Sequence, residues 1–231
     1  MFSLSPLELE AVRLSLKVSV WAVGISLPFG IAVAWLLARR EFPGKSLFDA
    51  IIHLPLVVPP VVIGYLLLVL FGRKGAVGAW LYDTFGITVA FSWQGAAVAA
   101  AVMAFPLMVR AIRLSIEAID TRLEQAARTL GAGPLDVFFS IALPLTGSGI
   151  VVGVILAFAR ALGEFGATIT FVSAIPGETA TLPIALYGLT QVPGQENSAV
   201  RLVVLSVIIA FVAMFVSELI ARRVRRRISG Q

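Results

Sequence analysis

The sequence predicts an all-α membrane protein with five transmembrane helices. Of its 231 residues, 59% are hydrophobic and 13% are charged, and the mean hydropathy is +0.98. Soluble globular chains are typically about 45–50% apolar and about 25% charged. The chain also contains several apolar runs near the length of about 20 residues that a helix needs to cross a hydrocarbon core. Because backbone N–H and C=O groups cannot stay unpaired in lipid, we expect these runs to be helices of one transmembrane domain.

The five predicted spans cover about residues 18–38, 50–71, 87–109, 141–159 and 202–217. The first span follows Arg13 and Lys17 and so imitates a cleavable signal peptide. Its apolar run, however, continues to Ala38 and stops only at Arg39 and Arg40. We therefore interpret it as a retained helix.

The second span contains Pro55, Pro59 and Pro60. Each proline removes a backbone donor and clashes with the preceding turn, so the helix is expected to be kinked or locally unwound. Two interpretations are open, a flexible segment that lines a transport pathway or acts as its gate, and a static kink of the kind that membrane helices tolerate. Gly64, later in this span, is expected to permit close contact with another helix.

The distribution of basic residues predicts an external N-terminus and a cytoplasmic C-terminus. With five spans, this orientation places 12 of the 18 lysine and arginine residues inside, five of them in the cluster Arg222, Arg223, Arg225, Arg226 and Arg227. Lysine and arginine favour the cytoplasmic side. Residues 110–140 then form a cytoplasmic loop, and residues 160–198 form the longest external loop.

The external loop begins with Arg160 and Glu164, which are four residues apart and are followed by Thr168. Ionisable groups at membrane depth are functional candidates, so these residues are assigned to an external gate or a weak anion contact. The alternative is an ordinary ion pair between positions i and i+4 of a helix. Residues 166–175 are apolar but too short to cross, and form either a re-entrant piece or a continuation of the fourth helix.

The cytoplasmic loop has helical spacing, with Leu123, Ala126, Ala127 and Leu130 on one small face. Glu124, Gln125 and Arg128 lie off this face. Spacing alone favours an amphipathic helix that lies on the membrane surface. A handle for a partner protein is the other interpretation, because a small face can enter a groove closely.

Three residues predict how this loop is shaped. Asp120 suits the N-cap of a short helix, Gly131 suits its left-handed C-terminal end, and Pro134 suits the first turn of a second helix. The loop is therefore expected to be a helix, a sharp turn and a second helix that leads into the membrane.

The same loop resembles the EAA motif of permease subunits in binding-protein-dependent ABC importers. The matching positions are Gln125, Ala126, Ala127, Gly131, Ile141, Leu143 and Pro144, with Gln125 at the place of the motif's glutamate and Glu124 one position earlier. The resemblance implies the ABC importer permease fold and a coupling helix that contacts a separate ATPase. The residues assigned to this coupling are Glu124, Gln125, Ala126, Ala127, Arg128, Leu130, Gly131, Leu143 and Pro144.

The resemblance extends over about residues 10–220 and narrows to the molybdate ABC transporter permeases. It is carried by FPGK at 42–45, HLPLVVPPVVIG at 53–64, FPLMVRAIR at 105–113 and AFARALGEFGATITF at 157–171. It implies a bacterial inner-membrane protein that pairs with a second copy. Two ATP-binding subunits, carrying ATP and magnesium, and an external oxyanion-binding protein complete the expected complex.

Composition excludes other classes of protein. With no cysteine and one histidine, His53, the chain has no thiol chemistry and too little histidine for a metal site, and it contains no phosphate-binding GxxxxGK[ST] loop. No catalytic constellation or cofactor is expected, and its basic charge indicates a membrane anchor rather than nucleic-acid binding. The alternatives that remain are a sulfate or tungstate permease and a gradient-driven secondary transporter.

Overall fold

The computed structural model describes residues 5–228, and every regular element in this range is helical. The prediction of an all-α chain is therefore confirmed. Within residues 5–228, three helices are long and apolar enough to cross a membrane alone, and two bent pairs raise the number of spans to as many as five. In chain order the elements are α1 (Pro6–Arg39), α2 (Lys45–His53), the 3-10 turn η1 (Leu54–Leu56), α3 (Pro60–Phe71), α4 (Ala76–Phe85), α5 (Trp93–Glu117), α6 (Thr121–Thr129), α7 (Pro134–Val137), the π-helical turn η2 (Phe138–Ala142), α8 (Leu143–Leu145), α9 (Gly147–Leu162), α10 (Gly166–Val172), α11 (Leu182–Thr190) and α12 (Glu196–Ile228).

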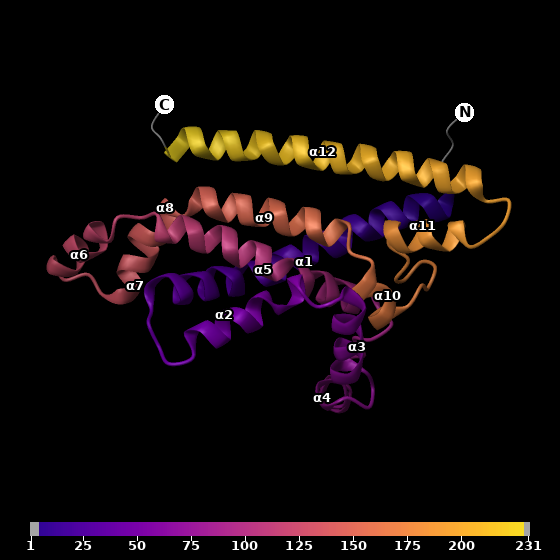
Figure 1. The fold of residues 1–231 in the computed structure, drawn as a ribbon, viewed down its shortest axis with the longest axis horizontal. Coiled ribbons are helices and arrows are strands. Elements are labelled where there is room, and N and C mark those ends of the chain that lie inside the picture. Colours follow the sequence, from indigo (N-terminus) through magenta and orange to yellow (C-terminus); the bar gives the residue numbers. More distant parts are fainter. Residues whose placement is uncertain (1–4, 229–231) are drawn as a thin grey trace.

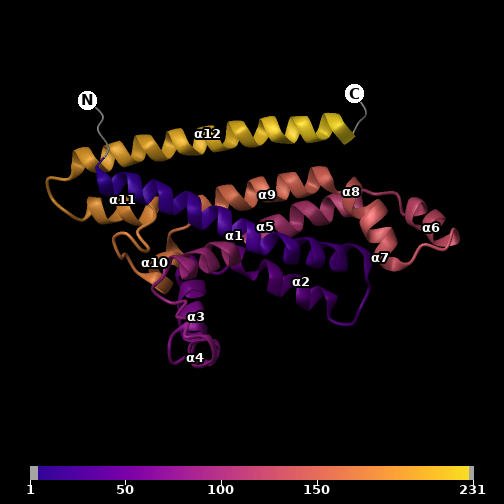
Figure 2. The same cartoon turned by 180° about the vertical axis from the view of Figure 1, so that it is seen from behind.

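The long helices α1, α5, α9 and α12 run along the long axis of the molecule, with α12 as the outermost layer (Figures 1 and 2). Helix α5 is central, since 61% of its most apolar window is buried, against 11% for the corresponding part of α12. The buried face of α5 is rich in alanine, which lets α1 and α9 approach closely. The exposed apolar side chains of α12 provide a surface for lipid.

Glycines bring α9 against α5. A Cβ atom at Gly149 would lie 2.2 Å from the Cβ of Ser115, and one at Gly153 would lie 3.1 Å from Cγ1 of Ile112. Small residues of this kind allow the backbones of membrane helices to come into direct contact. Helices α1, α5 and α9 therefore form the packed core of the fold.

The second predicted span is broken at its prolines. Helices α2 and α3 are bent by 108° relative to one another, with η1 and residues 57–59 between them. The predicted kink is confirmed, and the break divides the second span into two helices. As a result, α3 points away from the long helices and carries α4 at its far end (Figure 1).

Helix α10 excludes one of the two interpretations of residues 166–175. It is not a continuation of α9, because Gly163, Glu164 and Phe165 separate the two helices. It buries Ala167, Thr168, Phe171 and Val172 and packs against α3 and α5. Residues 166–172 of the apolar run thus form a short helix packed inside the protein, and residues 173–175 lie beyond it and are exposed.

The close contact predicted at Gly64 is confirmed, and its partner is α10. A Cβ atom at Gly64 would lie 2.5 Å from the carbonyl oxygen of Ala167 and 2.8 Å from the Cβ of Thr170. The first of these atoms belongs to the backbone and cannot move aside by a side-chain rotation. Any side chain at position 64 must therefore push α3 away from α10.

We expect Gly64→Ala to lower the free energy of unfolding by about 1–3 kcal/mol, the usual cost of overpacking. This corresponds to a drop of roughly 2–12 °C in the melting temperature of the detergent-purified chain. Gly24→Ala is the matched control, because a Cβ atom there meets nothing within 4 Å. Equal melting temperatures for the two variants would show that the α3–α10 contact is loose.

The remaining boundaries differ in detail from those expected. Helix α5 begins at Trp93 rather than at residue 87, since Ser92 caps it by accepting a hydrogen bond from the Gly95 N–H at 3.2 Å. Residues 110–117 belong to α5, so the loop between the spans begins only after Glu117. The predicted external loop 160–198 contains two helices, α10 and α11.

Candidate functional site: the coupling segment and the broken helix

The first candidate site is the segment from α6 through α8, which we call the coupling segment. Its helices α6 and α7 form one end of the molecule, beyond the ends of α1, α5 and α9 (Figures 1 and 2). The side chain of Asp120 accepts a hydrogen bond from the Arg122 N–H at 2.9 Å and caps α6. Pro134 occupies the first turn of α7. Both predictions from the sequence are confirmed.

The turn between α6 and α7 depends on Gly131. Its φ angle is +93°, in the left-handed region that favours glycine, and its N–H donates to the Arg128 carbonyl at 3.0 Å. Nearby, the N–H of Gly133 donates to Oδ2 of Asp136 at 3.1 Å. The predicted left-handed position is confirmed, and these bonds set the direction in which α7 leaves the turn.

The small face of α6 is open to the outside. Leu130 is 89% exposed and Leu123 is 50% exposed, Ala126 is exposed, and Ala127 is half-buried. Gln125 and Arg128 are exposed as well. Most of the residues assigned to coupling are therefore exposed in this chain, as expected for a surface that a partner covers.

Glu124 is the exception on α6, because it is buried and faces α1. Its Oε1 accepts from Nε of Arg39 at 2.8 Å. The other two residues assigned to coupling lie in α8, where Leu143 is half-buried and Pro144 is exposed. The π-helical turn η2 joins α7 to α8, and the chain bends by 67° between Pro134–Leu145 and Gly147–Leu162.

The second candidate site is the break in the second span, together with the residues that the structure places beside it. Pro55 lies in η1, Pro59 precedes α3, and Pro60 is its first residue. A Cβ atom at Gly166, the first residue of α10, would lie 2.8 Å from the Cβ of Pro60. The two groups of gate candidates, which are far apart in the sequence, are therefore neighbours.

Arg160 and Glu164 form the i,i+4 ion pair that the sequence allowed, with 2.6 Å between Nη1 and Oε2. Glu164 is buried, and its Oε1 also accepts the Ala167 N–H at 2.8 Å. Thr168 is buried too, and its hydroxyl donates to the Phe165 carbonyl at 2.9 Å. The carboxylate thus links the end of α9 to the start of α10, directly behind the proline break.

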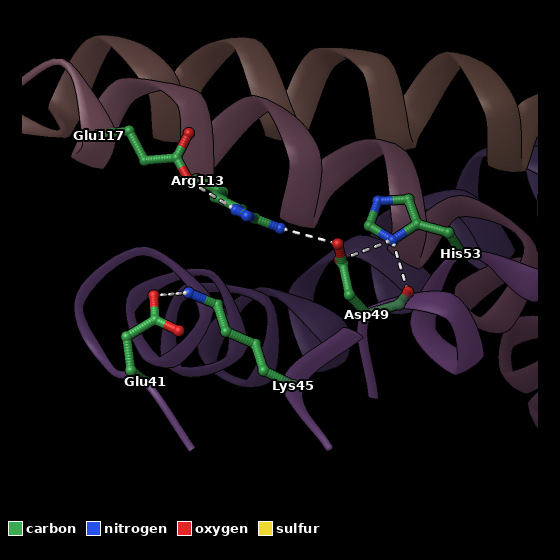
Figure 3. A network of polar contacts seen from close by, with 6 residues as sticks. All are labelled: Glu41, Lys45, Asp49, His53, Arg113 and Glu117. Atoms are coloured by element: carbon green, nitrogen blue, oxygen red, sulfur yellow. Dashed lines mark hydrogen bonds and ion pairs between the residues drawn. The ribbon is translucent and has the colours of Figure 1, made fainter. Parts of the chain in front are cut away.

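A group of four polar side chains on α2 and α5 was not predicted from the sequence. Arg113 on α5 donates from Nε to Oε1 of Glu117 at 2.7 Å and from Nη1 to Oδ2 of Asp49 at 3.0 Å. His53 lies beside Asp49, with 2.9 Å between Nδ1 and the Asp49 carbonyl oxygen (Figure 3). A pocket of about 340 Å³ opens onto these four side chains and onto Arg110.

The position of this group follows from the fold. Asp49 and His53 are four residues apart on α2, and Arg113 and Glu117 are four residues apart on α5. That double spacing was the available signal, but it does not show that the two helices meet. The Asp49–Arg113 pair attaches the half of the broken span that comes before the prolines to the central helix.

The chain matches a known protein family over most of its length. The model of the binding-protein-dependent transport system inner membrane component matches residues 26–229. The chain belongs to this family. The match includes both the broken span and the coupling segment, so these two sites lie within the shared part of the family. The members are membrane components of transport systems, which confirms that the chain is a permease subunit and not an enzyme.

Individual relatives narrow the comparison. The chain is 67% identical over 203 residues to the molybdenum transport system permease protein ModB of Escherichia coli strain K12, covering 88% of this chain and 89% of ModB. It is 36% identical to the sulfate transport system permease protein CysW of Synechocystis, covering 86% of this chain and 73% of CysW. The resemblance to molybdate permeases is therefore confirmed.

Solved structures support the fold. A bacterial ABC transporter that imports the acidic polysaccharide alginate matches with a TM-score of 0.75 at 18% identity, covering 95% of this chain and 80% of that chain. The methionine transporter MetNI matches with a TM-score of 0.68 at 19% identity, covering 94% of each chain. At this level of identity the match shows the ABC importer permease fold alone.

Proposed function

We propose that this chain carries molybdate across the bacterial inner membrane as the transmembrane subunit of an ATP-driven importer. The observation that supports this most strongly is the identity of 67% to a molybdenum permease over most of both chains, against 36% to a sulfate permease. Two copies would enclose the pathway, and ATPase subunits with ATP and magnesium would dock on the coupling segment. An external oxyanion-binding protein would deliver the substrate.

The exposed face of α6 supports the ATPase as the partner at this end. Leu130, Leu123 and Ala126 present apolar surface beside the polar Gln125 and Arg128. The chain contains no phosphate-binding loop of its own, so the energy of ATP must enter through another subunit. Movement of α6 would then pass through the Gly131 turn into α7, and from there into α9.

The broken span supports a pathway between two copies. Pro55, Pro59 and Pro60 interrupt the backbone hydrogen bonds, and Val57, at the break, is 83% exposed. Irregular backbone at membrane depth is stable only where it is covered by protein or lines water. Lipid cannot meet this requirement, whereas a water-filled path at a dimer interface can. We therefore assign the gate to residues 54–60 and to the Arg160, Glu164 and Thr168 group behind them.

The basic residues support a cytoplasmic position for the coupling segment. Arg39, Arg40, Arg122 and Arg128 lie in or beside α6 and the adjoining end of α1, and lysine and arginine favour the cytoplasmic side. In the predicted topology, the terminal arginine cluster at 222–227 lies on the same side of the membrane. The N-terminus is then external and the C-terminus cytoplasmic.

The substrate is tested by measuring ATP hydrolysis in proteoliposomes that contain the complete complex and the oxyanion-binding protein. We expect molybdate to stimulate hydrolysis and sulfate to leave it at the basal rate at equal concentration. Tungstate, the other alternative oxyanion, is measured in parallel. Stimulation by sulfate but not by molybdate would overturn the substrate assignment and favour the sulfate permease alternative.

A further inference from the structure

The coupling segment is attached to α1 by contacts between residues far apart in the sequence. Arg39, the last residue of α1, donates from Nε to Oε1 of Glu124 at 2.8 Å and from Nη2 to the carbonyl oxygen of Ile119 at 3.2 Å. Trp35, one turn earlier, packs edge-on against Phe138 of η2, with the ring centroids 5.5 Å apart. The end of α1 thus holds both sides of the coupling segment, before and after the Gly131 turn.

The ion pair is sheltered from solvent. The side chain of Arg39 is 12% exposed and that of Glu124 is 9% exposed. By contrast, Glu41 and Lys45, at the same end of the chain, form an ion pair in which Glu41 is 89% exposed. An exposed pair contributes little, whereas removing one partner of a buried pair leaves an uncompensated charge. Removing one partner of the Arg39–Glu124 pair is therefore expected to cost more free energy than removing one partner of the Glu41–Lys45 pair.

The order of the helices along the chain shows why a contact between α1 and the coupling segment matters. The coupling segment lies between α5 and α9 in the sequence, so both of these helices move with it through the backbone. Helix α1 has no such continuity, although it packs along α5 and α9. It can follow the coupling segment only through non-covalent contacts, of which the buried ion pair is the strongest by charge.

Helix α1 also carries contacts at its opposite end. Glu8 accepts from Nε of Arg201 on α12 at 3.1 Å, and Oγ of Ser15 accepts from the Leu182 N–H of α11 at 2.7 Å. A displacement of the Arg39 end would therefore reach α11 and α12 through a single continuous helix of 34 residues.

We infer that the Arg39–Glu124 pair transmits the movement of the coupling segment to α1, and that Arg39 is a positioning residue of the transport cycle. This inference rests on the proposed docking of an ATPase on α6. It also separates the roles of two neighbouring positions: Gln125 faces outward toward the partner, while Glu124 faces inward toward α1.

The test uses the complete complex in proteoliposomes with the oxyanion-binding protein and molybdate. The variants are Arg39→Gln, Glu124→Gln and the double charge swap of Arg39→Glu with Glu124→Arg. We expect each single variant to retain the co-purifying ATPase, but to transport at least about fivefold less molybdate per ATP hydrolysed, the lower end of typical coupling energies. The double variant is expected to recover more than about half of the lost ratio, since it restores the pair.

Glu41→Gln is the matched control and should keep the wild-type ratio, since the side chain of Glu41 is 89% exposed. A wild-type ratio in both single variants would overturn the inference. If a single variant fails to assemble, the charge-swap variant decides. A charge-swap variant that assembles without recovering the ratio of molybdate transported to ATP hydrolysed also overturns the inference. Failure of the wild-type chain to retain the ATPase would instead refute the proposed docking.

Discussion

Gly131→Pro is expected to lower molybdate uptake strongly while leaving the membrane core folded. Proline requires a φ angle near −65°, whereas position 131 has +93°, and the substitution also removes the N–H that donates to the Arg128 carbonyl. Local backbone strain of this kind costs about 1–3 kcal/mol. Because each 1.4 kcal/mol is a factor of about ten, we expect a loss of uptake between roughly fivefold and roughly 140-fold.

The measurement is uptake of molybdate into proteoliposomes, with co-purification of the ATPase as the readout of docking. Gly133→Ala serves as the control, since position 133 has a negative φ angle and keeps its N–H in alanine. Uptake by Gly131→Pro within twofold of the wild type would show that the turn does not set the position of α6.

Glu164→Ala is expected to give the largest loss of stability. The substitution leaves Arg160 without its partner at 2.6 Å and removes the acceptor of the Ala167 N–H at the start of α10. Breaking a buried ion pair from one side costs about 3–5 kcal/mol. In a chain of this length, that corresponds to a melting temperature lower by roughly 6–20 °C.

Two comparisons sharpen this result. Glu164→Gln keeps an oxygen that can accept from Ala167, so its melting temperature should lie between those of Glu164→Ala and the wild type. Glu41→Gln alters an exposed pair and should leave it unchanged. If Glu164→Ala melts like the wild type but transports poorly, the group acts as a gate without holding α9 to α10.

Local features of the fold could be predicted from the sequence because they depend on neighbouring residues. The cap at Asp120, the left-handed Gly131 and the start of α7 at Pro134 all follow from the conformational limits of single residues. The kink at the prolines followed in the same way. Its angle of 108° did not, because α10, which packs against α3, comes from a distant part of the chain.

The ion pairs also differ in whether the sequence could predict them. Arg160 and Glu164 are four residues apart, and their contact was one of the two interpretations drawn from the spacing. The Arg39–Glu124 pair joins residues that are 85 positions apart, and the Arg113–Asp49 pair joins residues 64 apart. Such contacts require knowledge of which helices pack together, and hydrophobic periodicity does not supply it.

Measuring which energy source drives molybdate uptake is the most direct test of the proposed transport function. Proteoliposomes are prepared with this chain, with or without the partner ATPase, and molybdate uptake is measured with trapped ATP, in the presence and absence of an uncoupler and with the oxyanion-binding protein outside. Uptake is expected to require both the ATPase and ATP, and to persist when the membrane potential is removed. Uptake by the chain without the ATPase, driven by an ion gradient and stopped by the uncoupler, would contradict it.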